Sequence, residues 1–166
     1  MEFSVLGPLE VRAGSRLVDV GGRRQRAVLA RLLMAGGQVV SAGRLVADLC
    51  PGQDYARALG GLQTYISNLR RVLEPNRPPY TPARLLVSRP PGYALCAPAD
   101  SVDAWRFEAA VRDGVNAIDR HRPRSAAQLL EEALGRWRGS PLARTSAGEP
   151  RPKPRNEPPR QRSASC

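Results

Sequence analysis

Residues 62–73 read LQTYISNLRRVL, and the spacing of their side chains predicts the central helix of a small domain. At about 100° per residue, four apolar side chains fall on one narrow stripe: Leu62, Ile66, Leu69 and Leu73. The opposite arc carries two arginines and four residues with hydroxyl or amide groups, and no acidic residue. Such an arc suits phosphates and base edges in a nucleic-acid groove, although a solvated helix face would look the same taken alone.

The charge of the chain points to the same region. The 166 residues carry a formal net charge of +11, with 26 Lys and Arg against 15 Asp and Glu. Residues 1–96 hold +7 of this charge, residues 97–142 are neutral, and residues 143–166 hold +4. A basic balance predicts attraction to polyanions but says nothing about fold. The first segment is therefore the predicted polyanion binder.

The sequence indicates neither secretion nor metal binding. The opening MEFSVLGPLEV has no basic region ahead of an apolar run, and no apolar stretch reaches membrane-spanning length. Cys50, Cys96 and Cys166 are too widely spaced for a CxxC pair, and His121 has no ligand-type neighbours in sequence. We expect a cytoplasmic protein with reduced thiols, without membrane contact, metal or cofactor. The chain also lacks a phosphate-binding glycine loop, and nothing in it supports an enzyme.

The order of predicted elements within residues 1–96 is a strand pair, three helices and a second hairpin. The elements are a hairpin from the runs 2–11 and 16–20, a helix within 23–37, an extended link at 38–41, a short helix after a Ser41 cap, a long helix from near Tyr55 to before Pro75, and strands around an Arg-Pro-Pro-Gly turn within 85–97. The second and third helices form a helix-turn-helix, and the closing hairpin forms a wing. This order is the plan of a winged helix.

Residues 103–117 and 125–138 predict an antiparallel helix pair. Its shared apolar face is expected to consist of Trp105, Phe107, Val111, Leu129, Leu130, Leu134 and Trp137. Such a pair is about one tetratricopeptide-like repeat, and about three are needed for independent stability. Residues 144–166 contain no Leu, Ile, Val or aromatic residue, so this basic tail is expected to be disordered. We interpret the abrupt change as a frameshift or premature stop that truncates the helical domain.

Several motifs together carry a resemblance to a known family. They are LGPLEVR at 6–12, GGRRQRAVLARLLMAGGQVVS at 21–41, LQTYISNLRRVLEP at 62–75 and RPPGYAL at 89–95. In this order they resemble the DNA-binding domain of the Streptomyces antibiotic regulatory protein family, which is similar to the winged helix of OmpR-type response regulators. Downstream, VDAWRFEAAV at 102–111 and LLEEALGRWRGSPLA at 129–143 resemble the start of that family's bacterial transcriptional activator domain.

The resemblance covers residues 1–143 and implies an α+β fold in three parts. These are an OmpR-like winged helix-turn-helix at 1–96, the start of a truncated tetratricopeptide-like activator domain at 97–143, and the disordered tail at 144–166. It further implies a regulator of a secondary-metabolite pathway that binds direct repeats in double-stranded promoter DNA. RNA polymerase and a second copy of the chain on the DNA are the further partners it implies.

A recognition helix would place one face of residues 55–73 in the major groove. On the same wheel, an outward row runs through positions 57, 60, 64, 67 and 71. The candidate contacts are Arg57, Thr64, Ser67 and Arg71, with Asn68 and Arg70 on the flanks. Each of them could equally be an idle surface side chain, since only a few side chains of such a module reach base edges.

Gly60 is where the row departs from the family, which usually carries a polar or basic residue, an Asn and an Ala before LQTY. Here the stretch reads Leu59-Gly60-Gly61, and two glycines cost a helix on the order of 1–2 kcal/mol. Bare backbone at Gly60 could allow close approach to a phosphate, or the missing side chain could weaken the site. The sequence leaves both interpretations open.

Arginines outside the long helix supply further candidates. Arg89 precedes the wing turn and could enter the minor groove, clamp a phosphate or remain solvated. Arg23, Arg24 and Arg26 open the first helix and could contact backbone phosphates or only solubilise it. Cys50 stands where the family often has Trp, which predicts a small core residue.

The leading hypothesis is a DNA-binding regulator that activates poorly because its activator half is cut short. One alternative is an interaction protein that docks on an intact regulator or on polymerase, or competes for its sites. Another is a basic nucleic-acid binder without sequence preference, driven by the arginine-rich tail.

Overall fold

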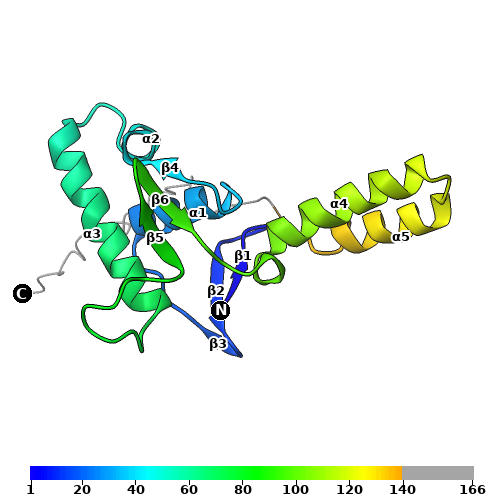
Figure 1. The fold of residues 1–166 in the computed structure, drawn as a ribbon, viewed down its shortest axis with the longest axis horizontal. Coiled ribbons are helices and arrows are strands. Elements are labelled where there is room, and N and C mark those ends of the chain that lie inside the picture. Colours follow the sequence, from blue (N-terminus) through cyan, green and yellow to red (C-terminus); the bar gives the residue numbers. More distant parts are fainter. Residues whose placement is uncertain (140–166) are drawn as a thin grey trace, which may run out of the picture.

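A computed structural model describes residues 1–139, so the predicted tail at 144–166 lies outside the described residues. Residues 1–97 form a compact body, and two long antiparallel helices project from it as an arm (Figure 1). The helices are α1 (Arg23–Leu33), α2 (Ala42–Leu49), α3 (Tyr55–Leu73), α4 (Asp103–Asp119) and α5 (Pro123–Leu134). The arrangement confirms the predicted α+β fold, with a winged helix followed by a helical hairpin.

The body opens with a three-stranded antiparallel sheet in the order β1-β2-β3. Its strands are β1 (Glu2–Ser4), β2 (Glu10–Ala13) and β3 (Arg16–Leu17). The expectation of a single strand over residues 2–11 was wrong, because the chain reverses between Ser4 and Glu10 and the two halves pair with each other. Pro8 lies in this reversal, where its missing N–H costs no ladder hydrogen bond.

The three helices of the body pack around one core, as predicted. On α3 the apolar stripe from Leu62 to Leu73 is buried. The helix begins where the Asp54 side chain accepts a hydrogen bond from the Arg57 N–H at 3.0 Å, and α2 begins where the Ser41 hydroxyl accepts one from the Arg44 N–H at 3.1 Å. Both contacts are N-caps that satisfy donors left free by the first helical turn.

The wing is the hairpin of β5 (Leu86–Arg89) and β6 (Gly92–Leu95). Residues 38–41 were expected to be only a link, but Val40–Ser41 forms β4, which pairs with β6 and gives the order β4-β6-β5. Gly92 allows this close approach, because a Cβ there would lie 1.9 Å from the Val40 carbonyl oxygen. The Ala42 N–H also donates to the Pro91 carbonyl at 3.1 Å, so the wing is fixed to the start of α2.

The arm confirms the predicted helix pair but not all of its predicted face. Gly114 on α4 lies against Leu130 on α5, and a Cβ at Gly114 would be 3.0 Å from that leucine's Cδ2 atom. Leu134 was expected in the shared face but is 63% exposed. Trp105 also differs from the expectation, because it packs on the body and its indole N–H donates to the Leu33 carbonyl at 2.8 Å. The close approach of α4 and α5 depends on the missing side chain of Gly114, while the Phe107 and Trp137 rings, both predicted in the shared face, meet edge to face with centroids 5.5 Å apart.

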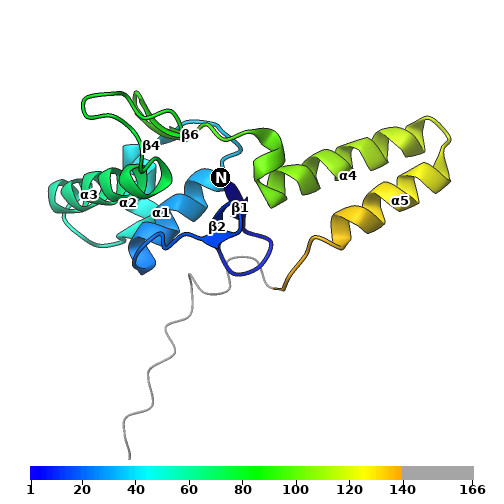
Figure 2. The ribbon, with the colours of Figure 1, turned by 90° about the horizontal axis from the view of Figure 1, so that it is seen from below.

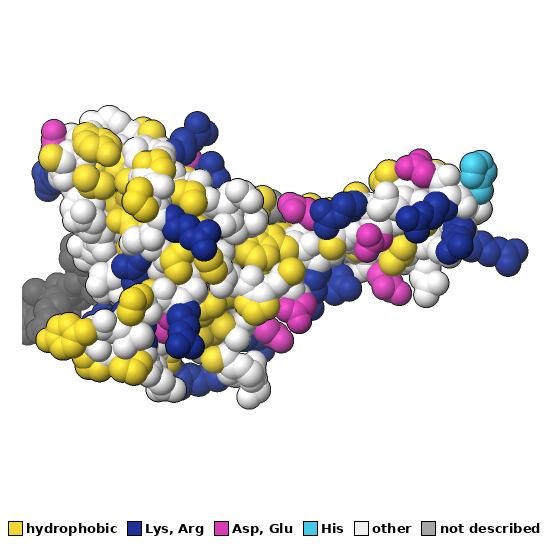
Figure 3. Space-filling model, in the orientation of Figure 1, with side chains coloured by type: hydrophobic (Ala, Val, Ile, Leu, Met, Phe, Trp, Pro, Cys, Tyr) yellow, Lys and Arg dark blue, Asp and Glu magenta, His cyan; other side chains and the backbone are white. Residues whose placement is uncertain are grey.

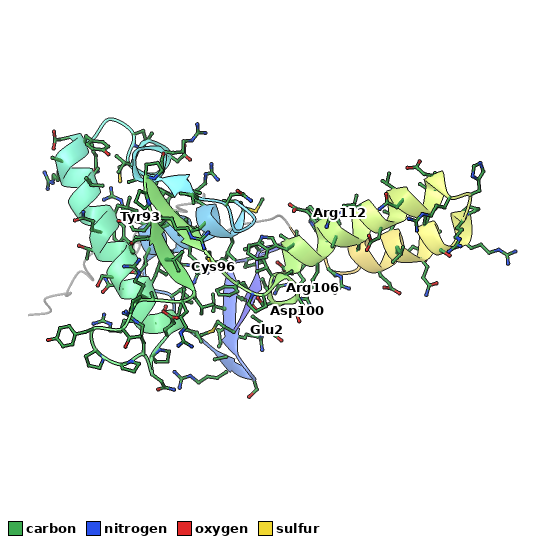
Figure 4. The ribbon with its side chains drawn as sticks, viewed as in Figure 1. Glu2, Tyr93, Cys96, Asp100, Arg106 and Arg112 are labelled. Atoms are coloured by element: carbon green, nitrogen blue, oxygen red, sulfur yellow. The ribbon has the colours of Figure 1, made fainter. Side chains whose placement is uncertain are left out.

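Both ends of the arm are hydrogen-bonded to the turn between β1 and β2. The start of α4 lies beside β1 in Figure 2. At the start of α4, the buried Asp103 carboxylate accepts hydrogen bonds from the N–H groups of Val5 at 2.8 Å and Leu6 at 3.1 Å. After α5, the Arg138 N–H donates to the Leu6 carbonyl at 2.7 Å, and its guanidinium lies 3.3 Å from a Glu10 carboxylate oxygen. In Figure 4 the labelled Asp100 and Arg106 lie at this base of the arm, near Glu2 on β1. The arm is therefore an extension of the body.

Candidate nucleic-acid interface

The outward row on α3 lies in the open, on the side of the helix away from the core. Positions 57, 60, 64, 67 and 71 are all exposed, while the flanking Asn68 and Arg70 are half-buried. The helix lies along one edge of the body (Figure 1). Between Tyr55 and Leu73 it carries no acidic residue. The structure thus brings the predicted row together on one accessible, basic and polar surface.

The polar groups of the row bond only to their own helix. The Thr64 hydroxyl donates to the Gly60 carbonyl at 3.1 Å, and an Arg71 guanidinium N–H donates to the Asn68 amide oxygen at 3.2 Å. Because the Thr64 proton is used, its oxygen is left to accept a hydrogen bond from outside. The Arg57 guanidinium makes no hydrogen bond or ion pair within residues 1–139. The row can therefore present both donors and an acceptor to a ligand.

Gly60 is not required by the packing of the protein. A Cβ at Gly60 would have no heavy atom within 4 Å, and one at Gly61 would only touch the Tyr65 ring at 4.0 Å. Neither glycine has a positive φ. Each therefore costs α3 roughly 1 kcal/mol relative to alanine without a steric reason inside the fold. Both interpretations of Gly60, close approach of a ligand or a weakened site, remain.

Arg70 has a role that the helical wheel could not indicate. Its Nε–H donates to the Leu86 carbonyl at 2.8 Å, and a terminal N–H donates to the Ser88 hydroxyl at 2.8 Å. Both acceptors belong to β5 of the wing. Arg70, predicted on the flank of the groove-facing row, instead joins the long helix to the wing.

Arg89 lies at the tip of the wing, as predicted. It pairs through its backbone with Gly92 across the turn, and its side chain is exposed with Pro90 and Pro91 beside it. The Arg89 guanidinium makes no hydrogen bond or ion pair with the residues that the structure describes. It is thus free to contact a partner.

The arginines of α1 are divided between the surface and the fold. Arg23 and Arg24 are exposed and line one hollow with Asp48 and Leu49 of α2. Arg26 instead donates to the Leu9 carbonyl and is half-buried. Arg23 and Arg24 are therefore separate candidates for contact with an anion, while Arg26 is engaged within the protein.

An ion-pair cluster on α1 and α2 was not predicted from the sequence. The Asp48 carboxylate lies between the guanidinium groups of Arg31 at 2.9 Å and Arg44 at 3.0 Å. The hydrogen bond from Arg31 is the main cause that holds the pKa of Asp48 below its ordinary value, with a smaller contribution from Arg44. The spacing of Arg44 and Asp48 by four residues could have indicated one half of this cluster. The cluster neutralises positive charge beside α2 and leaves the row on α3 as the clearest acid-free surface.

The arm, unlike the row on α3, carries acidic as well as basic side chains. Figure 3 shows Asp and Glu side chains interspersed with Arg along it, with the exposed His121 at its far end. Groups of three or more His, Cys, Asp or Glu side chains that could hold a metal ion do not occur within residues 1–139. No helix in this part of the chain is long and apolar enough to cross a membrane. The interface for an anionic partner is therefore best sought on the body.

Comparisons with known proteins agree with the order of the two parts. Residues 20–95 match the family described as transcriptional regulatory protein, C terminal, and residues 102–166 match the bacterial transcriptional activator domain. The chain is 39% identical over 143 residues to the transcriptional regulatory protein MoaR1 of Mycobacterium tuberculosis, which covers 86% of this chain and 45% of MoaR1. It is 30% identical over 154 residues to the regulatory protein DnrI of Streptomyces peucetius, which covers 89% of this chain and 56% of DnrI.

A solved structure is also similar across body and arm. It is that of Mycobacterium tuberculosis EmbR in complex with a low-affinity phosphopeptide, with a TM-score of 0.76 and 33% sequence identity. The similarity covers 87% of this chain but 38% of the EmbR chain. The chain thus spans less than half the length of MoaR1 and of the EmbR chain.

Proposed function

This chain belongs to the Streptomyces antibiotic regulatory protein family of transcriptional regulators, and from that premise we propose that it binds double-stranded DNA with the exposed row of α3 in the major groove. The observation that carries this proposal is the acid-free surface from Arg57 to Arg71 on the long helix of a helix-turn-helix. Arginine, threonine and serine at these positions supply the donors and acceptors that read base edges and phosphates.

The length of the row limits how it can be used. Arg57 and Arg71 are 14 residues apart, which is about 21 Å along a helix axis. The major groove is about 12 Å wide. With the helix axis across the groove, one of the two arginines would lie beyond the groove floor, and we assign it to a phosphate at the groove wall. We assign Thr64 and Ser67, between them, to base edges.

The wing supplies a second contact in this proposal. Arg89 extends from the tip, where it can reach a phosphate or the minor groove beside the site occupied by α3. The family resemblance further supports binding to direct repeats near promoters of a secondary-metabolite pathway, with two copies of the chain on adjacent repeats and contact with RNA polymerase. Each of these three features is part of the proposal.

The test begins with selection of binding sites from a random double-stranded library by the full chain. Affinity for the selected sequence and for a scrambled version is then measured by fluorescence anisotropy. The key variant is Arg57→Gln with Arg71→Gln. The matched control is Arg112→Gln with Arg124→Gln, which removes the same charge from exposed positions on the arm (Arg112 is labelled in Figure 4).

We expect the α3 variant to lose most of its preference for the selected sequence and the arm variant to keep it. Equal losses in both variants would support the alternative of a basic binder without sequence preference. Failure of the wild-type chain to enrich any sequence would overturn the proposal and favour the interaction-protein alternative.

A further inference from the structure

One edge of the wing has no neighbouring strand. In the order β4-β6-β5, β6 is central and β5 is the edge strand. The inner side of β5 is bonded to β6 along its whole length, from Leu86 opposite Leu95 to Arg89 opposite Gly92. An edge strand leaves carbonyl and N–H groups without ladder partners on its other side. The Leu86 carbonyl is such a group, and its partner is the Arg70 side chain of α3.

Arg70 holds this edge at two points. Its Nε–H donates to the Leu86 carbonyl and a terminal N–H donates to the Ser88 hydroxyl, both at 2.8 Å. The two acceptors are two residues apart on β5, one a backbone carbonyl and the other a side-chain hydroxyl. A planar guanidinium presents two donors on separate nitrogens in a fixed fork that spans such a pair, whereas the donors of a lysine ammonium share one nitrogen and have no fixed direction. The contact therefore fixes the orientation of β5 relative to α3 as well as its distance.

The position of this contact links the two predicted DNA-contacting elements. On α3, Arg70 is followed directly by Arg71, the last residue of the groove-facing row. On β5, Ser88 is followed directly by Arg89 at the wing tip. Arg70 is half-buried, whereas Arg71 and Arg89 are both exposed. The engaged arginine is thus the sequence neighbour of one exposed arginine and bonds to the sequence neighbour of the other.

We propose that Arg70 is a positioning residue for DNA recognition, which fixes the wing relative to α3 so that Arg89 reaches the DNA while the α3 row occupies the major groove. This inference rests on the proposed function. It assigns Arg70 no contact with DNA of its own. The competing assignment is a direct phosphate contact by Arg70, and the two differ in what they demand of the side chain. Positioning needs the guanidinium fork, while a phosphate contact needs mainly the positive charge.

The test is a double-mutant cycle with the full chain and its selected DNA site. Arg70→Lys keeps the charge and removes the fork, and it is combined with Arg89→Ala. The control cycle combines Arg71→Lys with Arg89→Ala, since Arg71 bonds only to Asn68 on its own helix. We expect Arg89→Ala alone to weaken binding by roughly tenfold, the order of one charge-assisted hydrogen bond. Arg70→Lys alone should give a loss close to that.

Positioning predicts that the two losses do not add. Once Arg70→Lys has freed β5 from α3, Arg89→Ala should weaken binding by less than about twofold further, whereas in the Arg71→Lys background it should keep its full effect. Because the freed strand loses the Arg89 contact, the dependence of log affinity on log salt in Arg70→Lys should match that of Arg89→Ala. Additive losses in the Arg70 cycle would overturn the inference. So would wild-type affinity in Arg70→Lys. A salt slope in Arg70→Gln with Arg89→Ala that is lower by about 0.9 than in Arg89→Ala alone would also overturn it, because that difference is one phosphate contact made by Arg70 itself.

A measurement without DNA separates this inference from the proposed function. Hydrogen exchange of the β5 and β6 amides should be faster in Arg70→Lys, and to a smaller degree in Ser88→Ala, which removes one of the two bonds. Exchange in α1 and α4 should not change. Unchanged exchange in the wing would overturn positioning even where DNA binding is intact. If the wild-type chain bound no DNA while wing exchange in Arg70→Lys rose as expected, the proposed function would fail. The contact of Arg70 with β5 would then only stabilise the fold, and its role in recognition would be overturned as well.

Discussion

The Asp103 carboxylate accepts a hydrogen bond from the Val5 N–H at 2.8 Å, although 98 residues separate the two in sequence. The same carboxylate accepts hydrogen bonds from the Leu6 N–H and from the N–H of Ala104, the residue after Asp103. One buried side chain thus serves the turn between β1 and β2 and the first turn of α4. Removing it leaves several buried donors without partners.

Asp103→Ala should therefore lower the free energy of unfolding by about 2–4 kcal/mol, since each buried donor left without a partner costs about 1–3 kcal/mol. Urea unfolding monitored by circular dichroism measures this change. The control is Asp113→Ala, an exposed acid on the same helix, which should stay within about 0.5 kcal/mol of wild type. Equal stability of the two variants would contradict the assigned role of Asp103.

Gly92→Ala should destabilise the wing severely. The added Cβ would lie 1.9 Å from the Val40 carbonyl oxygen and 2.6 Å from the Ser41 Cα, so β4 and β6 would have to separate. We expect a loss of more than about 2 kcal/mol in thermal or urea unfolding. The control is Gly43→Ala on α2, where the added Cβ would have no atom within 4 Å, and this variant should instead gain up to about 1 kcal/mol.

Gly60→Ala distinguishes the two interpretations of the glycine in the α3 row. The free energy of unfolding should rise by about 1 kcal/mol, because alanine favours the helix and meets no atom. If DNA needs bare backbone at this position, affinity for the selected site should fall although the fold gains stability. An affinity equal to or above wild type would identify a site weakened by the glycine. Gly61→Ala, half-buried beside Tyr65, is the matched control for the helix gain.

The Asp48 cluster predicts a dependence of stability on pH. Because Arg31 and Arg44 lower the pKa of Asp48 in the folded state, the carboxylate stabilises the fold above its ordinary pKa of 3.8. This contribution is lost as pH falls through the lower pKa of the folded state. At pH 7, Asp48→Asn should cost roughly 0.5 kcal/mol, the usual value for a partly exposed ion pair. The difference between wild type and variant should shrink as urea titrations are repeated from about pH 5 towards about pH 2.

Binding to DNA should weaken steeply with salt. With roughly 4–6 phosphate contacts, the logarithm of affinity should fall with the logarithm of salt concentration at a slope of about −4 to −5. Anisotropy titrations between low and moderate salt measure this slope. A flat dependence would mean that the arginines of the body do not neutralise phosphates.

Much of the fold was predictable because its patterns are local. The stripe from Leu62 to Leu73 defines the buried face of α3 without reference to any partner, and Ser41 and the Pro-Pro-Gly turn mark element boundaries through their own backbone preferences. The strand β4 was not predictable, because two residues carry no period and become a strand only through pairing with β6.

The features of the candidate interface were likewise predictable only where they depend on local sequence. A helical wheel gives the direction of each side chain, so the exposure of Thr64 and Arg71 could be predicted. It cannot give the distance to another element, and so Arg70 was placed on the groove-facing flank when its guanidinium in fact reaches Leu86. The role of Asp103 left no trace in sequence, since its partners are backbone groups that any residue would supply.

The double attachment of the arm determines how force would pass through the molecule. Its two ends meet the same turn of the N-terminal sheet, one through Asp103 and the other through Arg138, so neither helix can pivot without pulling on residues 5–7. A force applied near His121 at the far end would rotate the arm about that turn. The force would act on β1 and β2 and, through the hydrogen bond of the Trp105 indole, on the end of α1.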